Sequence, residues 1–219
     1  MITPTRKDRN MKIILDTGIV AVIRAQSSDQ LVRVFDALME GGVKAIEVTM
    51  TTPNALDVIR DLSNKMKNEE AVVGVGTVLD PETARAAILA GAEYVVSPTL
   101  NLETVKMCRR YSAAVIPGAY TPTEILTAWE AGADIVKVFP ATTLGPGFFK
   151  DVLGPLPQVR LSPTGGVSLE TVKDFIKAGA CCVAVGGNLV SKAALAEQNW
   201  KKIAETAKQF IQLIQEARA

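Results

Sequence analysis

The sequence contains no histidine. This absence excludes nucleophiles that depend on a histidine base, such as Ser-His and Cys-His pairs, and all His-ligated metal sites. Proton transfer would then fall to carboxylates, lysines, tyrosines, hydroxyls or water. Cysteines are also scarce. Cys108, Cys181 and Cys182 show no metal-ligand spacing such as CxxC, and we interpret them as reduced thiols packed as small hydrophobic side chains.

A strong net charge, a long hydrophobic run and a linker are lacking too. The net charge is +1, so no overall field favours binding to nucleic acid or to an anionic membrane. The longest apolar runs, such as residues 71–75, have the size of a strand and are far too short to span a membrane. The first ten residues are too polar for a signal peptide, and we expect a cytoplasmic location. Without a Pro/Gly/Ser-rich linker, we expect one domain over residues 1–219.

A short segment that opens on glycine recurs along the chain, at Gly42, Gly91, Gly132 and Gly179. Each copy follows a helical stretch and opens a strand, and the spacing of the copies fits two strand–helix units. Intervening strands are expected at residues 19–24, 72–77, 114–117 and 159–164. Eight strands, each followed by a helix, predict an α/β fold, a single-domain (β/α)₈ TIM barrel.

Helices are predicted from capping and proline signals. Their expected starts are Ser28-Asp29, Thr52-Pro53, Asp80-Pro81, Thr121-Pro122 and Ser168. An extra N-terminal helix near residues 4–16 would cover the bottom of the barrel. A long amphipathic helix is expected over about residues 191–218.

Lys137 stands in a short apolar strand, where a barrel normally has an apolar side chain. Burial disfavours an ammonium group, so the pKa of this lysine should fall and its amine become available as a nucleophile. Aligning the repeated glycines places Glu47 at the equivalent position of another strand. Because side chains alternate along a strand, Glu47 and Lys137 would both face the barrel interior. Thr49 and Phe139 would lie one step nearer the carboxyl ends of the strands, where active sites of this fold lie.

This charged pair has two interpretations. One is a structural ion pair, although burial usually costs such a pair as much as it returns. The other is catalytic: the amine of Lys137 condenses with a ketone to a Schiff base, and the carboxylate of Glu47 shuttles protons. A lysine with a nearby carboxylate, in a chain without histidine or a metal motif, favours the catalytic interpretation. No cofactor and no metal are expected.

Two Gly-Gly pairs follow the last two predicted strands, Gly165-Gly166 after Thr164 and Gly186-Gly187 before Asn188. Both precede helical segments, so we expect their backbone N–H groups at helix N-termini, which bind anions. The loops after strands seven and eight are the usual phosphate site of this barrel. Tight turns that need glycine are the alternative, but two pairs in the two expected loops favour a phosphate site.

The motifs around the two charged residues resemble those of a known family. They read Gly-x-x-x-Val-Lys-Val-Phe-Pro-Ala over residues 132–141 and Gly-x-x-x-Ile-Glu-Val-Thr over residues 42–49. They resemble the signatures of 2-keto-3-deoxy-6-phosphogluconate aldolase, the class I lyase also called 4-hydroxy-2-oxoglutarate aldolase. The resemblance covers nearly the whole chain, through residues 22–24, 76–77, 97–98, 116–118, 164–166 and 186–187.

The resemblance implies a role for each matching residue. Lys137 would form the Schiff base with pyruvate or with the C2 ketone of the substrate, and Glu47 would act as acid and base through a water. The implied pyruvyl pocket contains Thr77, Pro98 and Phe139, with Arg24 near the substrate. The implied phosphate site consists of Gly165, Gly166, Gly187 and Asn188. Thr49, Thr51 and Thr164 complete the substrate-binding candidates.

Two positions depart from the family pattern. The family usually has an arginine two residues after the threonine of Glu-Val-Thr, where it holds the pyruvyl carboxylate. This chain has Thr51 there, and a hydroxyl is a far weaker partner for a carboxylate than a guanidinium. Arg24 or the helix N-terminus near Pro53 would have to compensate. The phosphate-binding serine of the family is replaced by Asn188, which can still donate.

The resemblance thus predicts a metal-independent carbon–carbon lyase that cleaves 2-keto-3-deoxy-6-phosphogluconate to pyruvate and glyceraldehyde 3-phosphate. A second predicted substrate is 4-hydroxy-2-oxoglutarate, cleaved to pyruvate and glyoxylate. The alternatives are the same chemistry on the galactonate epimer, decarboxylation of oxaloacetate, or a non-catalytic phosphosugar-binding barrel. The expected partners are a phosphorylated keto acid, pyruvate and further copies of this chain in a homotrimer, with no nucleic acid and no membrane.

Overall fold

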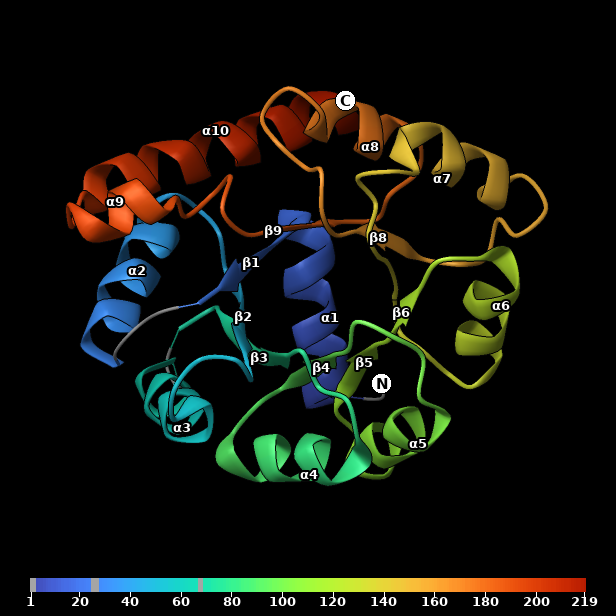
Figure 1. Ribbon diagram of the computed structural model, residues 1–219, viewed down its shortest axis with the longest axis horizontal. Helices are drawn as coiled ribbons and strands as arrows, with labels where there is room; N and C mark the ends of the chain where they lie inside the picture. Colours follow the sequence, from blue (N-terminus) through green and yellow to red (C-terminus); the bar gives the residue numbers. More distant parts are fainter. Residues whose placement is uncertain (1–2, 25–27, 67–68) are drawn as a thin grey trace.

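The computed structural model describes residues 3–24, 28–66 and 69–219 of the chain. Strands and helices alternate along it after an initial helix (Figure 1). The helices are α1 (Arg6–Thr17), α2 (Ser28–Glu40), α3 (Ala55–Lys65), α4 (Pro81–Ala90), α5 (Leu102–Arg110), α6 (Pro122–Glu130), α7 (Gly145–Leu153), α8 (Val172–Lys177), α9 (Lys192–Ala196) and α10 (Trp200–Arg218). The strands are β1 (Ile19–Ile23), β2 (Ala45–Thr49), β3 (Val72–Gly76), β4 (Tyr94–Val96), β5 (Ala114–Ile116), β6 (Gly118–Ala119), β7 (Val136–Val138), β8 (Leu161–Pro163) and β9 (Val183–Val185).

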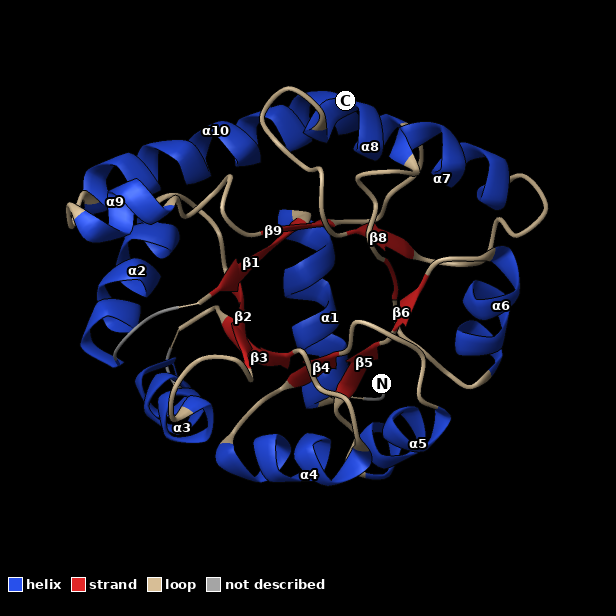
Figure 2. Cartoon of the chain, viewed as in Figure 1, coloured by secondary structure: helices blue, strands red, loops and turns tan. Residues whose placement is uncertain are grey.

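The strands pair in parallel in two sheets, β5-β4-β3-β2-β1-β9 and β6-β7-β8. Figure 2 shows the strands in a ring with helices around the outside. The strand expected over residues 114–117 ends at Ile116, and Pro117 separates β5 from β6 because proline has no N–H for the ladder. An isolated bridge between Thr164, directly after β8, and Ala184, in the middle of β9, links these two strands. The parallel α/β prediction is confirmed, and the expected continuous sheet is divided in two.

The two faces of the strands bury different sets of side chains. Ile46, Val48, Val136 and Val138 belong to the hydrophobic cluster that includes buried helix residues such as Phe149. The opposite face contributes to a second, smaller cluster inside the ring, which includes Val20, Ala45, Val72, Tyr94, Val96, Ile116, Cys182 and Ala184. The alternation that was used to place Glu47 and Lys137 on the inner face therefore holds for their neighbours in both strands.

The predicted N-terminal helix is present as α1, and it lies behind the ring of strands (Figure 1). Its buried Met11 and Ile14 pack with the inner cluster, near the amino ends of the strands. A capping box at Thr5 and Asp8 starts the helix, and Gly18 in the left-handed conformation ends it. This arrangement leaves the opposite, carboxyl ends of the strands open.

In the described part of the chain, no helix is both long and apolar enough to cross a membrane.

Several helix boundaries differ from the prediction for local reasons. Asp80 and Thr121 cap α4 and α6 as expected, but α3 begins at Ala55, after Asn54 in the left-handed conformation. The Ser168 signal precedes a turn, and α8 begins only at Val172. The prediction of a single helix over residues 191–218 was wrong, because α9 and α10 are separate helices. Gln198 has a φ of 52° between them, and the side chain of Asn199 caps α10.

Candidate active site

Lys137 on β7 and Glu47 on β2 both lie inside the ring. Their exposed fractions are 6% and 1%, and both line one interior cavity of about 10 Å³, together with Ser162 and Thr164. That volume corresponds to roughly one water molecule. The Nζ atom of Lys137 lies 5.0 Å from the centroid of the Phe139 ring, at a distance typical of a cation–π contact.

The two charged side chains share this space without forming a direct ion pair. Among the ion pairs of the described residues, none joins Lys137 to Glu47 within 4.0 Å. In addition, Glu47 Oε2 is buried and has no hydrogen-bond partner there. A pair kept for stability needs close contact and satisfied hydrogen bonds to offset desolvation. The geometry therefore does not support the structural interpretation of the pair.

Glycines of β3 make room for the carboxylate of Glu47. In the register of β2 and β3, Glu47 pairs with Gly74 and Thr49 pairs with Gly76. A Cβ atom on Gly76 would overlap Glu47 Oε1 and lie only 2.7 Å from its Cγ. The side chain of Glu47 thus extends over Gly76 toward the carboxyl ends of the strands. Any side chain at position 76 would displace it.

Burial shifts the pKa values of Lys137 and Glu47 in opposite directions. Desolvation lowers the pKa of Lys137, opposed by the charge of Glu47 and assisted by that of Arg24. Desolvation raises the pKa of Glu47, opposed by the positive charges of Lys137 and Arg24. The lysine is thereby moved toward its neutral amine, which is the nucleophilic form. The carboxyl is moved toward the range in which it can both accept and donate a proton.

Two predicted pyruvyl-pocket residues, Thr77 and Pro98, and two further substrate-binding candidates, Thr49 and Thr51, lie at the ends of strands or directly after them. Thr49 is buried at the end of β2, and its Oγ1 lies 2.8 Å from Oγ1 of the exposed Thr51. Thr77, directly after β3, is a non-glycine residue with a positive φ of 59°. Pro98 is partly buried after β4, and its carbonyl oxygen lies where a Cβ atom on Gly118 would be. All four therefore lie at the end of the strands toward which Glu47 extends.

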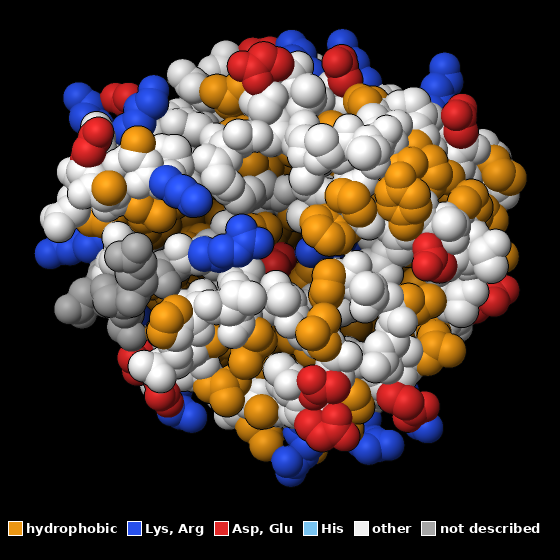
Figure 3. Space-filling model, viewed as in Figure 1, with side chains coloured by type: hydrophobic (Ala, Val, Ile, Leu, Met, Phe, Trp, Pro, Cys, Tyr) orange, Lys and Arg blue, Asp and Glu red, His pale blue; other side chains and the backbone are white. Residues whose placement is uncertain are grey.

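A cleft of about 270 Å³ brings together most of the other predicted residues. Its lining includes Arg24, Phe139, Thr164, Gly165, Gly166, Gly187 and Asn188. Thr164 lines both this cleft and the small interior cavity, so the cleft leads to Lys137. The Oγ1 atom of Thr164 is buried and has no hydrogen-bond partner in the described residues. The face drawn in Figure 3 is hollowed near its middle, with basic and acidic side chains visible in the hollow and hydrophobic ones around it.

The glycine loops offer backbone donors, although not at helix N-termini. Gly165 and Gly166 have φ values of 88° and 75°, and α8 starts only at Val172. The second loop likewise forms a turn before the short helix α9. The expectation of helix N-termini was therefore wrong. Within the described residues, the backbone N–H groups of Gly166, Gly187 and Asn188 have no protein acceptor, and they are available to an anion.

Asn188 connects the two loops, which the sequence did not predict. Its Nδ2 donates a hydrogen bond of 2.7 Å to the carbonyl oxygen of Val167. The amide is thus already engaged and holds one loop beside the other. Thr142, which sequence reasoning missed, lies beneath the first loop: a Cβ atom on Gly166 would be 2.9 Å from its Cα. No pattern in the sequence could have shown this contact, because the two residues come from different loops.

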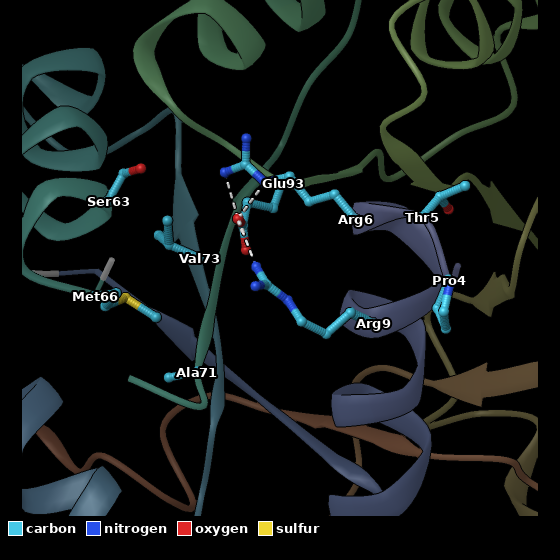
Figure 4. A pocket seen from close by; sticks show the side chains of 9 residues that line it. All are labelled: Pro4, Thr5, Arg6, Arg9, Ser63, Met66, Ala71, Val73 and Glu93. Carbon is cyan, nitrogen blue, oxygen red and sulfur yellow. Dashed lines mark hydrogen bonds and ion pairs between the residues drawn. The ribbon is translucent and has the colours of Figure 1, made fainter. Parts of the chain in front are cut away.

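A larger hollow than this cleft lies elsewhere, near the amino ends of the strands. Its volume is about 730 Å³, and Arg6 and Arg9 of α1 both point at Glu93 there (Figure 4). The rest of its lining includes Met66, Ala71 and Val73. Its charged groups satisfy each other, whereas those of the strand interior do not. Size alone therefore does not mark the reactive centre of this fold, which is expected at the carboxyl ends.

Comparisons with known proteins show the family to which the chain is similar. The family model for KDPG and KHG aldolase matches residues 11–206. The 2-dehydro-3-deoxy-phosphogluconate aldolase of Haemophilus influenzae is 34% identical, and the match covers 90% of this chain and 92% of the relative. The 2-dehydro-3-deoxy-6-phosphogalactonate aldolase of Escherichia coli is 30% identical over 91% of this chain and 95% of its own.

Solved structures named as KDPGal and as KDPG aldolase are both similar to this chain. A native KDPGal structure matches with a TM-score of 0.85 and 28% identity, covering 91% of this chain and 95% of the other. The KDPG aldolase of Legionella pneumophila, with pyruvate captured as a covalent carbinolamine, matches with a TM-score of 0.84 and 26% identity over 94% and 97% of the two chains. With one family model matching most of its length and relatives matching nine-tenths of it, the chain belongs to the KDPG and KHG aldolase family.

Proposed function

We propose that the protein is a class I aldolase that cleaves 2-keto-3-deoxy-6-phosphogluconate to pyruvate and glyceraldehyde 3-phosphate. The observation that carries this proposal is the pair of buried, unbonded groups, Lys137 and Glu47, on one interior cavity. The cleft that ends on this cavity carries free backbone donors for a phosphate. Arg24 in the lining of the same cleft offers a positive charge for the carboxylate of a keto acid.

The reaction begins at Lys137. Its neutral amine attacks the C2 carbonyl carbon of the keto acid, giving a carbinolamine that loses water and becomes a protonated Schiff base. The shift of the lysine pKa toward the neutral amine supports this step. The positive Schiff base then withdraws electrons from the substrate, so no metal ion is needed as an electron sink.

Glu47 moves the protons in the following steps. Its carboxylate accepts the proton of the C4 hydroxyl, directly or through a water in the cavity, as the C3–C4 bond breaks and the aldehyde leaves. The bonding electrons pass to the Schiff-base nitrogen, which leaves an enamine. Glu47 returns the proton to C3, and water then hydrolyses the Schiff base to pyruvate and the free amine of Lys137. The raised pKa of Glu47 suits a group that both takes and gives this proton.

Arg24 is the candidate for the carboxylate end of the substrate. It lines the cleft, and its charge acts on both Lys137 and Glu47. Thr51, where the family usually has an arginine, offers only a hydroxyl that already lies 2.8 Å from that of Thr49. A guanidinium can bind a carboxylate through two parallel hydrogen bonds. The phosphate at the other end would accept hydrogen bonds from the backbone N–H groups of the glycine loops.

A second candidate substrate is the galactonate epimer. It is supported by a relative named as a 6-phosphogalactonate aldolase and by the similar native KDPGal structure. We further propose that the two sheets together form one (β/α)₈ barrel within a single domain, supported by the bridge between Thr164 and Ala184. Cleavage of 4-hydroxy-2-oxoglutarate, the homotrimer and the cytoplasmic location stay predictions.

Reduction with borohydride in the presence of pyruvate tests the proposed nucleophile. We expect one stable adduct, which peptide mapping assigns to Lys137, and its formation should not depend on added EDTA. The rate of trapping should rise with pH and level off below the ordinary lysine pKa of 10.5, because burial lowers the pKa of Lys137. Lys137→Arg should form no adduct, and Lys150→Arg on α7 is the control. An adduct at any other lysine, or none, would refute the proposal.

Glu47→Gln separates proton transfer from Schiff-base formation. We expect kcat for cleavage to fall on the order of 10²- to 10⁴-fold, which is the usual contribution of a general acid or base. The adduct with pyruvate should still form. Its pH midpoint should move down, because the negative charge that raises the pKa of Lys137 is gone. Glu130→Gln, on the exposed end of α6, is the matched control. Cleavage at the wild-type rate would rule out this role for Glu47.

Turnover of a set of keto acids tests the substrate. We expect kcat/KM for 2-keto-3-deoxy-6-phosphogluconate to exceed that for the unphosphorylated acid by on the order of 10- to 100-fold, the effect of one charge-assisted contact. Including the galactonate epimer in the same assay decides between the two phosphorylated candidates. Equal efficiency with and without phosphate would mean that the glycine loops bind no phosphate.

Arg24→Ala tests which group holds the pyruvyl carboxylate. Pyruvate has no phosphate, so its concentration dependence in borohydride trapping reports the carboxylate contact alone. We expect the half-saturating pyruvate concentration to rise on the order of 10-fold or more, with partial recovery in Arg24→Lys, which keeps the charge but not the bidentate geometry. Arg33→Ala on α2 serves as the control. No change in Arg24→Ala would point instead to other donors near Thr51.

A further inference from the structure

Tyr94 is a buried titratable residue that the proposed chemistry does not use. It begins β4, is fully buried and belongs to the cluster inside the ring. Its hydroxyl has no hydrogen-bond partner in the described residues. A phenylalanine would fill the same space without leaving a buried hydroxyl unpaired. The hydroxyl therefore costs stability in the free protein, which raises the question of what it does.

The ring of Tyr94 reaches across β3 toward the strand of Glu47. Gly74 on β3 pairs with Tyr94 on one side and with Glu47 on the other. A Cβ atom on Gly74 would overlap the Cε2 and Cζ atoms of the tyrosine ring. Since Cζ carries the hydroxyl, the polar end of Tyr94 lies over β3, between its own strand and β2. The absence of a side chain at Gly74 is what permits this position.

Glu47 presents the complementary group from the other side. Its Oε2 is buried without a partner, while Oε1 lies over Gly76. A phenol hydroxyl donates and a carboxylate oxygen accepts. Two unpaired groups of matching character thus project into one interior from the strands on either side of β3. The charge of Glu47 also acts on Tyr94 and, together with burial, raises the pKa of the phenol, so Tyr94 remains a neutral donor.

The other charged and titratable groups around the pair are few. Lys137 on β7 and Arg24 after β1 act on Glu47. Cys182 on β9 and Glu93 before β4 act on Tyr94. The two cations cannot accept a hydrogen bond from the phenol, and Glu93 is already bound by Arg6 and Arg9. Among these charged groups, Glu47 is therefore the acceptor without a partner that is available to the Tyr94 hydroxyl.

We propose that Tyr94 is a positioning residue whose hydroxyl, unpaired in the free protein, donates a hydrogen bond to Glu47 Oε2 once the substrate is bound to Lys137, and so holds the carboxylate over Gly76 during proton transfer. This inference rests on the proposed function. It assigns Tyr94 no contact with the substrate. Its effect is to fix the orientation of Glu47 and to favour the ionised carboxylate, because a donor stabilises the charged acceptor.

Exchange of the methyl protons of pyruvate in D₂O, measured by NMR against pH, tests the proposal. This half-reaction needs only Schiff-base formation at Lys137 and proton removal from C3 by Glu47. In Tyr94→Phe we expect the acidic limb of the exchange profile to move up by about one pH unit, because the lost hydrogen bond no longer favours ionised Glu47. The plateau rate should fall at least severalfold, while borohydride trapping of pyruvate stays at the wild-type level. Tyr111→Phe removes a surface hydroxyl bonded to Arg85 and is the matched control.

Thermal unfolding supplies the second measurement. Tyr94→Phe should unfold at the wild-type temperature or above it, because the substitution removes an unpaired buried hydroxyl. An acidic limb and plateau equal to those of the wild type would overturn the proposal. So would a loss of exchange that is matched by a loss of trapping or of thermal stability, since this would reveal a structural role. Absence of trapping at Lys137 in the wild type would instead refute the proposed function itself.

Discussion

The burial of two opposite charges without contact between them is the constraint on which the site depends. A lysine and a glutamate that met as an ion pair would stabilise each other, and the lysine would remain an ammonium ion. Here Lys137 and Glu47 border a cavity of about 10 Å³ instead. Desolvation then lowers the pKa of the lysine and raises that of the glutamate. The separation thus favours the neutral amine of Lys137, and it leaves Glu47 Oε2 without a hydrogen-bond partner among the described residues.

This arrangement is possible because two residues of β3 have no side chains. Gly74 leaves space for the ring of Tyr94, and Gly76 leaves space for the carboxylate of Glu47. Glycine inside a strand is unfavourable on its own, since it gains no packing and loses more backbone entropy on folding. In β3 that cost allows two polar side chains from neighbouring strands to enter the same narrow interior. The site is thus shaped by absent side chains as much as by the reactive ones.

The sequence predicted the elements that follow from local pattern. The parallel alternation of strands and helices, the cap at Asp80 and the inward position of Lys137 all depend on periodicity or on neighbouring residues. It failed where distant segments decide the outcome. The break at Gln198, the contact of Thr142 with Gly166 and the bond from Asn188 to Val167 join residues whose patterns are unrelated. The sequence also gave no sign that Gly74 and Tyr94 occupy one space, because only the strand register brings them together.

The exposed Arg24 would connect the binding of a substrate carboxylate with the protonation of the buried pair, because its charge acts on both groups. Its positive charge lowers the pKa of Lys137 and of Glu47, and so favours the neutral amine and the ionised carboxylate in the empty site. An anion bound to Arg24 would offset that charge, and both pKa values would then rise. On the Lys137 nitrogen, the offset charge would favour the protonated Schiff base that exists after the neutral amine has attacked. For Glu47 the rise comes as the carboxylate must become a stronger base. An arginine in place of Thr51 would hold the same anion, but Arg24 already acts on both reactive groups before the anion arrives.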